Sequence, residues 1–544
     1  KGYGEENDFC QRAEGAGWRN LHLLDTFVLH TGGVSFGDSK SPRERAAMEK
    51  LARLHPNYAT DVHKFVQADP ARPYRLALDV ARIRDGNLPV VLAVLHDRAG
   101  GTVRHVRELA EHLSGKAVFL TLTPCANKSL ALRMASEAEG FDLTFKIDEQ
   151  FEDLLNVLRQ LHVSHVHYHH LLGHDKHVRD IPALLNVTYD FTAHDFYSYC
   201  TYITITGEEN RYQSELSPGQ CKCCTPDMPA PMEGNVARWR GANARFLSAA
   251  RTVITPSHDT AKRIIGFAPA ANVHAIQHTD IDPSVPLPVP APQPITDKRA
   301  LRIVVLGALS AIKGADVLEA AAVEAARQGA PIEFHLLGYG YRHLLSQPKA
   351  ALSVHGAYKE EELSKLLAWL KPDLIWFPAQ WPETYSYTLS AALQAGLPVV
   401  VPDIGAFAER VVDRPWTWIH EWDRDAKEWV DFFEQIRKDN FAPAIAPSLE
   451  SAQPNAPKTP EADGWTYQSD YFTHMSAPSE PAADAAPLEG DYMAQFVPER
   501  AYSGATKAGI LGMLVYLRSL PVLRGVARKI PPQFQRQVKT WLNG

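Results

Sequence analysis

The sequence has few cysteines and no long apolar run. Only 6 of its 544 residues are Cys, which excludes a small scaffold held together by disulfides. No stretch approaches the roughly 20 apolar residues that a membrane-spanning helix needs, so we expect a cytoplasmic protein. The chain begins at Lys1 with neither an initiator Met nor a signal peptide, and we therefore expect a fragment whose upstream part is missing.

A large excess of charge of one sign is also absent. Lys and Arg total 56 and Asp and Glu total 63, which gives a net charge of −7 and no general attraction for nucleic acid. We therefore expect no nucleic-acid partner. The 33 Gly and 39 Pro are close to ordinary globular usage, which excludes collagen-like and fully disordered chains. At about 150 residues per domain, the length predicts three to four domains.

Short apolar runs alternate with helical patterns in two parts of the chain. Within residues 88–282 the runs are 90–95, 117–122, 165–170, 187–194 and 252–257. Within residues 298–440 they are 302–307, 332–338, 352–356, 373–378 and 398–403. Such alternation is typical of parallel α/β sheets. We predict two Rossmann-like, doubly wound α/β domains joined by a Pro-rich hinge at 283–297.

Three further segments flank these domains. Residues 1–85 are charged and end in a helical pattern. Residues 441–499 are rich in Pro and Ala without an apolar period, which predicts a linker that is disordered in part. Residues 500–544 carry eight Lys or Arg and no acid. This basic amphipathic tail predicts contact with an anionic membrane surface, as in a peripheral membrane protein, and the alternative is docking on the protein's own acidic body.

The strand ends of two doubly wound domains surround one cleft, which is where such sheets bind ligands. The stretch 307–314 (GALSAIKG) places Lys313 beside a helix N-terminus, a combination that suits a diphosphate; the alternative is a Lys on an ordinary exposed turn. Glu383 follows another strand and precedes a helix that begins with hydroxyl-bearing residues. The donor-binding candidates are Gly307, Lys313, Gly314, Glu383, Thr384, Tyr385, Ser386, Tyr387 and Thr388.

The block 378–411 (PAQWPETYSYTLSAALQAGLPVVVPDIGAFAERV), together with 307–314, resembles the nucleotide-sugar half of glycosyltransferase family 4 with the GT-B fold. The resemblance implies transfer of a hexose, with retention of configuration, from a nucleotide diphosphate sugar to a glycan or lipid-linked glycan. It implies a role in polysaccharide assembly of the lipopolysaccharide O-antigen or capsule type, and no cofactor for this module. It makes Lys313 and Glu383 catalytic candidates. Two positions depart from the family, because Ala308 and Ala391 stand where an Arg and a Glu are expected.

The first α/β domain is similar to the acceptor half of the same fold. Gly100, Gly101 and Thr102 are its acceptor-side candidates, because Gly allows a close approach to the backbone. His194 and Asp195 follow a strand, so we expect them to face the cleft as catalytic candidates. The resemblance implies that a His at such a position contacts the donor sugar; the alternative for His194 is a structural histidine. We also consider Arg263 as a replacement for the missing diphosphate cation.

Two groups of residues suggest metal sites. Seven His lie between His162 and His177, and His167 and His169 share a strand face; polar residues at a strand end are the alternative to a metal site. Four thiols could form a structural zinc site, although their spacing is not that of a usual zinc knuckle, and free loop cysteines are the alternative. They are Cys200, Cys221, Cys223 and Cys224.

The first residues, GYGEENDFCQRAEGAGWRN (2–20) and FVLHTGGVSFG (27–37), resemble the C-terminal part of a glycosyltransferase family 2 domain with the GT-A fold. The resemblance implies that Glu6 or Asp8 is a base and that His30 lies near a metal-bound diphosphate. A divalent metal is implied only for an intact GT-A domain. The nucleotide-binding strands lie upstream of this piece in the family, so we expect residues 1–85 to be an inactive remnant.

Two other classes of protein compete with a transferase. A non-catalytic GT-B scaffold that binds nucleotide or glycan is suggested by Ala308 and Ala391. A dinucleotide-dependent oxidoreductase is suggested by the two Rossmann-like domains. The second class is disfavoured because neither first-strand loop reads Gly-x-Gly-x-x-Gly.

Overall fold

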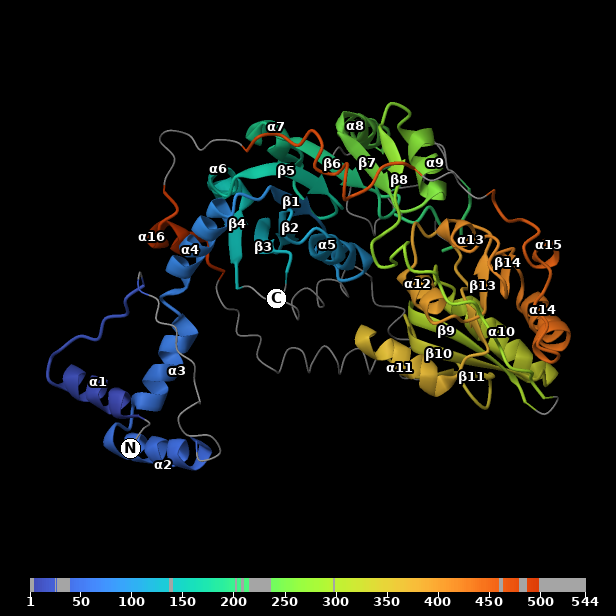
Figure 1. Ribbon diagram of the computed structural model, residues 1–544, viewed down its shortest axis with the longest axis horizontal. Coiled ribbons are helices and arrows are strands. Elements are labelled where there is room, and N and C mark those ends of the chain that lie inside the picture. Colours follow the sequence, from blue (N-terminus) through green and yellow to red (C-terminus); the bar gives the residue numbers. More distant parts are fainter. Residues whose placement is uncertain are drawn as a thin grey trace, which may run out of the picture.

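The computed structural model describes residues 4–24, 26, 40–136, 140–200, 203–206, 210–214, 236–296, 299–458, 463–478 and 487–498. Two α/β domains, each built on its own sheet, lie next to each other (Figure 1). Two Rossmann-like domains that face one cleft make up the GT-B architecture, so the predicted fold class is confirmed.

The first domain contains an eight-stranded sheet in the order β4-β3-β2-β1-β5-β6-β7-β8. Its strands are β1 (Val90–Val94), β2 (Val118–Cys125), β3 (Ser129–Met134), β4 (Asp142–Lys146), β5 (Val163–Tyr168), β6 (Thr188–Thr192), β7 (Thr252–Thr255) and β8 (Val273–Ala275). Its helices are α5 (Gly101–His112), α6 (Ile147–Gln160), η2 (Lys176–Asp180), α7 (Ile181–Leu185), α8 (Val236–Ala249) and α9 (His258–Phe267).

The sequence predicts a parallel sheet, but this sheet is only partly parallel. From β2 to β8 the neighbouring strands pair in parallel, whereas β3 is antiparallel to both β2 and β4. In the β2–β3 turn, Asn127 and Lys128 have positive φ values of 57° and 52°. That backbone conformation is normally signalled by Gly, which is why the hairpin was not predicted.

The second domain contains a six-stranded parallel sheet in the order β11-β10-β9-β12-β13-β14. Its strands are β9 (Leu301–Leu309), β10 (Ile332–Gly340), β11 (Leu352–Val354), β12 (Leu374–Trp376), β13 (Val399–Pro402) and β14 (Thr417–His420). Its helical elements are α10 (Ala315–Gln328), η3 (Glu360–Glu362), α11 (Leu363–Leu370), α12 (Tyr387–Gln394), α13 (Ala406–Glu409), α14 (Ala426–Ile436) and η4 (Arg437–Phe441).

Strand β9 runs through the middle of the second sheet and is buried on both faces. Ile303 and Val305 belong to one hydrophobic cluster, and Val304 and Leu306 belong to another on the opposite face. A parallel strand covered on both faces reads as a continuous apolar run. The apolar run of β9 ends at Leu306, and the next residue, Gly307, lines the cleft between the two domains.

The N-terminal residues form α1 (Glu5–Gly15), α2 (Lys40–Leu54), α3 (Tyr58–Ala68) and α4 (Arg72–Asp85). The described part of residues 1–85 contains helices and turns but no strand. Leu76 and Val80 of α4 are buried in the first domain's core, whereas α1 to α3 extend away from both domains, at the lower left of Figure 1. The assignment of this segment to a family 2 remnant stays a prediction.

Residues 441–498 differ from the expected linker. They contain α15 (Leu449–Ala452), α16 (Gly490–Met493) and η5 (Ala494–Phe496), and described parts of the segment pack on the first domain. Tyr471 is fully buried with Val91 and Phe119, and Met493 and Phe496 are buried in the main core. Residues 463–478 and 487–498 pack on the first domain because a few aromatic side chains supply burial that the Pro- and Ala-rich composition conceals. The expectation of a linker that is disordered in part stays a prediction.

The basic tail at 500–544 lies outside the described residues. Among the residues that the structure describes, no helix combines the length and apolar character required to cross a membrane.

Candidate active site

A cleft of about 820 Å³ lies between the two domains. The first domain contributes Gly100, Gly101 and Arg104 to its walls, and the second contributes, among others, Gly307, Ala308, Lys313, Gly338, Glu360, Glu383, Tyr385, Ser386, Tyr387, Thr388 and Ala391. Most of the predicted donor-side residues and both acceptor-side glycines therefore line one cavity. Its position at the carboxyl ends of the parallel strands is where open α/β sheets bind ligands.

Lys313 and Glu383 form an ion pair in this cleft. Lys313 Nζ lies 3.7 Å from Glu383 Oε1, and the side chain of Glu383 is 7% exposed whereas that of Lys313 is 47% exposed. Lys313 comes from the turn between β9 and α10, and Glu383 comes from the loop after β12. Because β9 and β12 are parallel neighbours, their following loops emerge at the same edge and bring the two side chains together.

The turn that carries Lys313 passes directly under the end of β12. Gly314, which precedes α10, has a φ of 85°, and a Cβ atom at this position would lie 2.0 Å from the carbonyl oxygen of Pro378. Both the backbone conformation and the available space therefore require Gly. Gly314 acts in this way as a support for Lys313 rather than as a wall of the cleft.

Tyr385 and Tyr387 connect the donor-side loop to the first domain. The Tyr387 hydroxyl donates to Glu108 Oε2 at 3.0 Å, and the Tyr385 hydroxyl donates to Asp280. The guanidinium of Arg104 lies 3.9 Å from the centre of the Tyr387 ring. Burial, together with the neighbouring carboxylates, raises the pKa of Tyr387 far above its ordinary value, so this phenol remains a hydrogen-bond donor at neutral pH.

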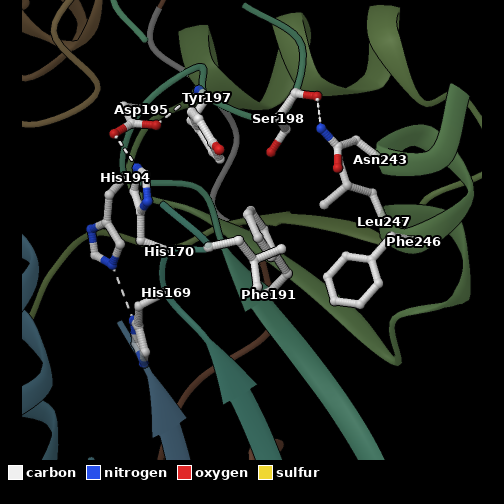
Figure 2. Close-up of a pocket in the computed structure, with 11 residues that line it drawn as sticks. His169, His170, Phe191, His194, Asp195, Tyr197, Ser198, Asn243, Phe246 and Leu247 are labelled. Atoms are coloured by element: carbon white, nitrogen blue, oxygen red, sulfur yellow. Dashed lines mark hydrogen bonds and ion pairs between the residues drawn. The ribbon is translucent and has the colours of Figure 1, made fainter. Parts of the chain in front are cut away.

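Thr384 links the same loop to His194, because its hydroxyl donates to the His194 carbonyl oxygen at 2.6 Å. Figure 2 shows the small pocket behind this contact, where His194 Nε2 lies 3.1 Å from His169 Nδ1 and Asp195 Oδ2 lies 2.9 Å from His170 Nε2. Burial raises the pKa of Asp195, but the His170 ring and the Tyr197 N–H outweigh it, so the net pKa is lowered.

The imidazole of His194 belongs to a group of desolvated histidines. Burial lowers the pKa of His105 to about 3 and holds those of His169, His194 and His278 well below their ordinary value. These rings are therefore neutral at pH 7. His105 could have been found from its spacing of four residues from Gly101, which places both residues on the same face of α5.

Besides Gly314, His194 and Asp195, three further predicted residues are not among the walls of the cleft. Arg263 lines a separate cavity with Tyr212 and Arg240, and its guanidinium binds Asp259 at 2.7 Å. The structure therefore does not place Arg263 where it would replace the missing diphosphate cation. Thr102 is buried within α5, and Thr384 is buried against His194.

The N-terminal candidates lie on α1, which Figure 1 places far from the second domain. Asp8 Oδ1 accepts from His55 Nε2 at 2.8 Å, and its other oxygen pairs with Arg12 at 3.0 Å. Hydrogen bonding from His55 lowers the pKa of Asp8. Glu6 is exposed, and His30 lies outside the described residues.

The predicted thiol zinc site stays a prediction. Cys200 is buried, while Cys221, Cys223 and Cys224 lie outside the part of the chain that the structure describes.

Glu409 links the two domains by hydrogen bonds beside the cleft. Its carboxylate on α13 accepts from the backbone N–H groups of His258 and Asp259, at 2.8 and 2.9 Å, at the start of α9 in the first domain. Burial raises the pKa of Glu409 from 4.5 to about 7, although the two N–H groups partly oppose the shift.

We expect Glu409 to make the free energy of unfolding depend on pH. Between pH 4.5 and 7 the folded chain holds a proton that the unfolded chain has released, so stability should fall as the pH rises through this window. The measurement is urea unfolding of wild type and Glu409→Gln at pH 5 and pH 8. From pH 5 to pH 8, the free energy of unfolding of wild type should fall by up to about 3 kcal/mol more than that of the variant. An equal difference at both pH values would contradict this assignment.

Residues 300–439 match the family described as "Glycosyl transferases group 1". This match identifies the second domain as a glycosyltransferase domain and confirms the predicted class of enzyme. No curated protein matches the chain.

The solved structures to which the chain is similar include a sucrose-phosphate synthase from Thermosynechococcus elongatus, at 14% identity and a TM-score of 0.40, covering 68% of this chain and 94% of that one. Anabaena HepE in complex with UDP is similar at 13% identity and a TM-score of 0.41, with 68% and 94% covered. A pneumococcal O-GlcNAc transferase, GtfA, in complex with UDP and GlcNAc is similar at 8% identity and a TM-score of 0.40, with 68% and 96% covered.

Proposed function

We propose that the chain transfers a hexose from a nucleotide diphosphate sugar to a hydroxyl of a glycan. The observation that carries this proposal is the Lys313–Glu383 pair, held 3.7 Å apart in a cleft to which both domains contribute. A half-exposed ammonium beside a buried carboxylate offers one group for the diphosphate and one for the sugar. The group 1 glycosyltransferase match over the same domain supports this use.

In the proposed reaction, the bond between the sugar's anomeric carbon and the diphosphate breaks while a bond to the acceptor oxygen forms. Negative charge develops on the leaving diphosphate, and Lys313 stabilises it more strongly in the transition state than in the ground state. We propose retention of configuration, with a phosphate oxygen of the donor taking the acceptor's proton. Glu383 orients the sugar by accepting hydrogen bonds from its hydroxyls.

Arg104 is our candidate for the charge that Ala308 does not supply. Among the described residues that line the cleft, the cations are Arg104 and Lys313. Arg104 reaches in from the first domain, pairs with Glu108 at 2.6 Å and also contacts Glu360 of the second domain. A diphosphate that displaced these carboxylates from Arg104 would be held from both domains at once.

A mass-spectrometric screen tests the proposal. The purified chain is incubated with single nucleotide diphosphate sugars and glycan acceptors, and the expected result is an acceptor that gains the mass of one hexose together with release of nucleoside diphosphate. The matched control is Glu383→Gln, which keeps the side-chain volume but removes the charge, and should lower product formation. A chain that binds a nucleotide sugar with neither transfer nor hydrolysis would instead be a binding scaffold.

We also propose that the acceptor is lipid-linked and belongs to cell-surface polysaccharide assembly. The support is the basic composition of residues 500–544, since cations near an anionic membrane each contribute about 1 kcal/mol to binding. The same screen contains a second arm, in which the acceptor lipid is presented on vesicles with and without anionic lipid. Transfer that is indifferent to anionic lipid, and equal for a chain ending at residue 499, would refute this part alone.

A further inference from the structure

Four histidines gather beside the cleft on four different elements. His105 lies on α5, His169 follows β5, His194 follows β6 and His278 follows β8. The centre of the His105 ring lies 5.5 Å from that of His169, 5.1 Å from that of His194 and 4.0 Å from that of His278. These residues are distant in the sequence, and the parallel sheet brings them together because the carboxyl ends of its strands share one edge.

Some ring nitrogens of this cluster have no hydrogen-bond partner among the described residues. His105 is 0% exposed, and neither of its ring nitrogens has a hydrogen-bond partner among the described residues. Nε2 of His169, which is 1% exposed, likewise has no partner in the described part of the chain. Buried polar groups without partners are costly and rare in folded proteins, so such a concentration needs an explanation.

We propose that His105, His169 and His194 bind a zinc ion through one ring nitrogen each. Among the described residues, these three histidines offer ligand atoms that all lie within 4.8 Å of one another. A tetrahedral site with Zn–N distances of about 2.1 Å places its nitrogens about 3.4 Å apart, so modest side-chain rotations would close the three rings on the ion. Neutral imidazoles without a thiolate are a ligand set that suits zinc.

Protonation of the cluster does not offer a better explanation. An extra proton would place an uncompensated charge in a desolvated site. The neighbouring carboxylate of Asp195 is already engaged by His170, and Asp280 accepts from Tyr385. A divalent cation satisfies the unpartnered nitrogens directly, and it is bound by the neutral form of histidine.

Zinc at this place would act as a positioning element for the donor-side loop. The His194 carbonyl oxygen accepts from Thr384, and the His278 ring lies 4.3 Å from the ring of Tyr385. The ion would therefore tie α5, β5 and β6 together immediately behind the loop that carries Glu383. The inference does not rest on the proposed transferase activity, because it concerns ion binding alone.

The test uses the full chain with Cys221, Cys223 and Cys224 replaced by Ser, so that the predicted thiol site cannot contribute. After treatment with a chelator, the protein is reloaded with Zn²⁺ or Co²⁺. We expect one equivalent of tightly bound metal by elemental mass spectrometry. The Co²⁺ form should show the visible absorption of a tetrahedral ion without a thiolate charge-transfer band.

The decisive variant is His105→Leu, which removes an unpartnered ring and fills most of its volume. It should lower the affinity for Zn²⁺ by more than about 100-fold, since even the loss of an outer-shell partner costs 10- to 100-fold. The matched control is His174→Gln in the same domain, because His174 is 5% exposed and its ring binds the Leu95 carbonyl at 2.9 Å. His335→Gln serves as a second control for the His335–His355 pair.

Circular dichroism establishes that each variant is folded, and His194→Gln replaces His105→Leu if the latter does not fold. Uptake below one equivalent by the chain that carries only the three Cys-to-Ser replacements, or an affinity equal in His105→Leu and His174→Gln, would overturn the proposal. Loss of the bound metal in His335→Gln would also overturn it, because the site would then lie in the second domain.

Discussion

Replacement of Lys313 by Ala should lower kcat for hexose transfer by about 10²–10³-fold, the usual effect of removing one preorganised group that stabilises charge in a transition state. The Lys313 ammonium lies in the turn after β9, 3.7 Å from Glu383, and faces the cleft in which the leaving diphosphate is proposed to bind. The measurement is kcat at saturating donor and acceptor, with the free energy of unfolding recorded for both proteins.

The matched control is Lys349→Ala, because Lys349 is an exposed lysine of the same domain outside the walls of the cleft. It should leave kcat unchanged. Lys313→Arg should keep part of the activity, since it preserves the charge but not the geometry of a point cation. If Lys313→Ala turned over as fast as Lys349→Ala, the leaving group would have to be stabilised by another residue.

Replacement of Gly338 by Ala should destabilise the second domain by more than about 4 kcal/mol, which is exceptional for one methyl group. Gly338 pairs with Gly307 in the β10–β9 register, and a Cβ atom at position 338 would lie 1.9 Å from the Gly307 carbonyl oxygen. Its φ of 139° adds backbone strain for any other residue. Chemical unfolding followed by circular dichroism measures the effect.

Gly329→Ala separates the steric effect from the backbone effect. Gly329 also has a positive φ, of 66°, but a Cβ atom there would meet no heavy atom within 4 Å. This control should therefore lose only the cost of the left-handed conformation, about 1 kcal/mol. Equal losses in the two variants would show that the contact between β9 and β10 can relax.

The arrangement of the main strands could be predicted from the sequence. Buried parallel strands read as short apolar runs, and the ten apolar runs of the sequence correspond to β1, β2, β5, β6, β7, β9, β10, β11, β12 and β13. Lys313 and Glu383 could be placed in one cleft for the same reason, since each follows a parallel strand whose carboxyl end lies at the same edge of the sheet.

Short or irregular elements escaped prediction because their signals are weak. The β2–β3 turn uses Asn127 and Lys128 in place of Gly, so the hairpin lacks its usual turn signal. The return of residues 463–478 to the first domain depends on a few buried side chains, such as Tyr471. Averaged composition cannot reveal such contacts, because the energy comes from the few residues that are buried rather than from the segment's mean polarity.

The sequence by itself therefore determined the two α/β domains, the strands that carry the site, and the placement of Lys313 and Glu383 in one cleft, since all three follow from local patterns and the geometry of parallel sheets. Only the tertiary structure decided that Arg263 faces a different cavity and that Arg104 lines the cleft. It also decided that His105, His169 and His194 meet. These outcomes depend on how separate helices and strands pack, and contacts between residues far apart in the chain leave no local signal in it.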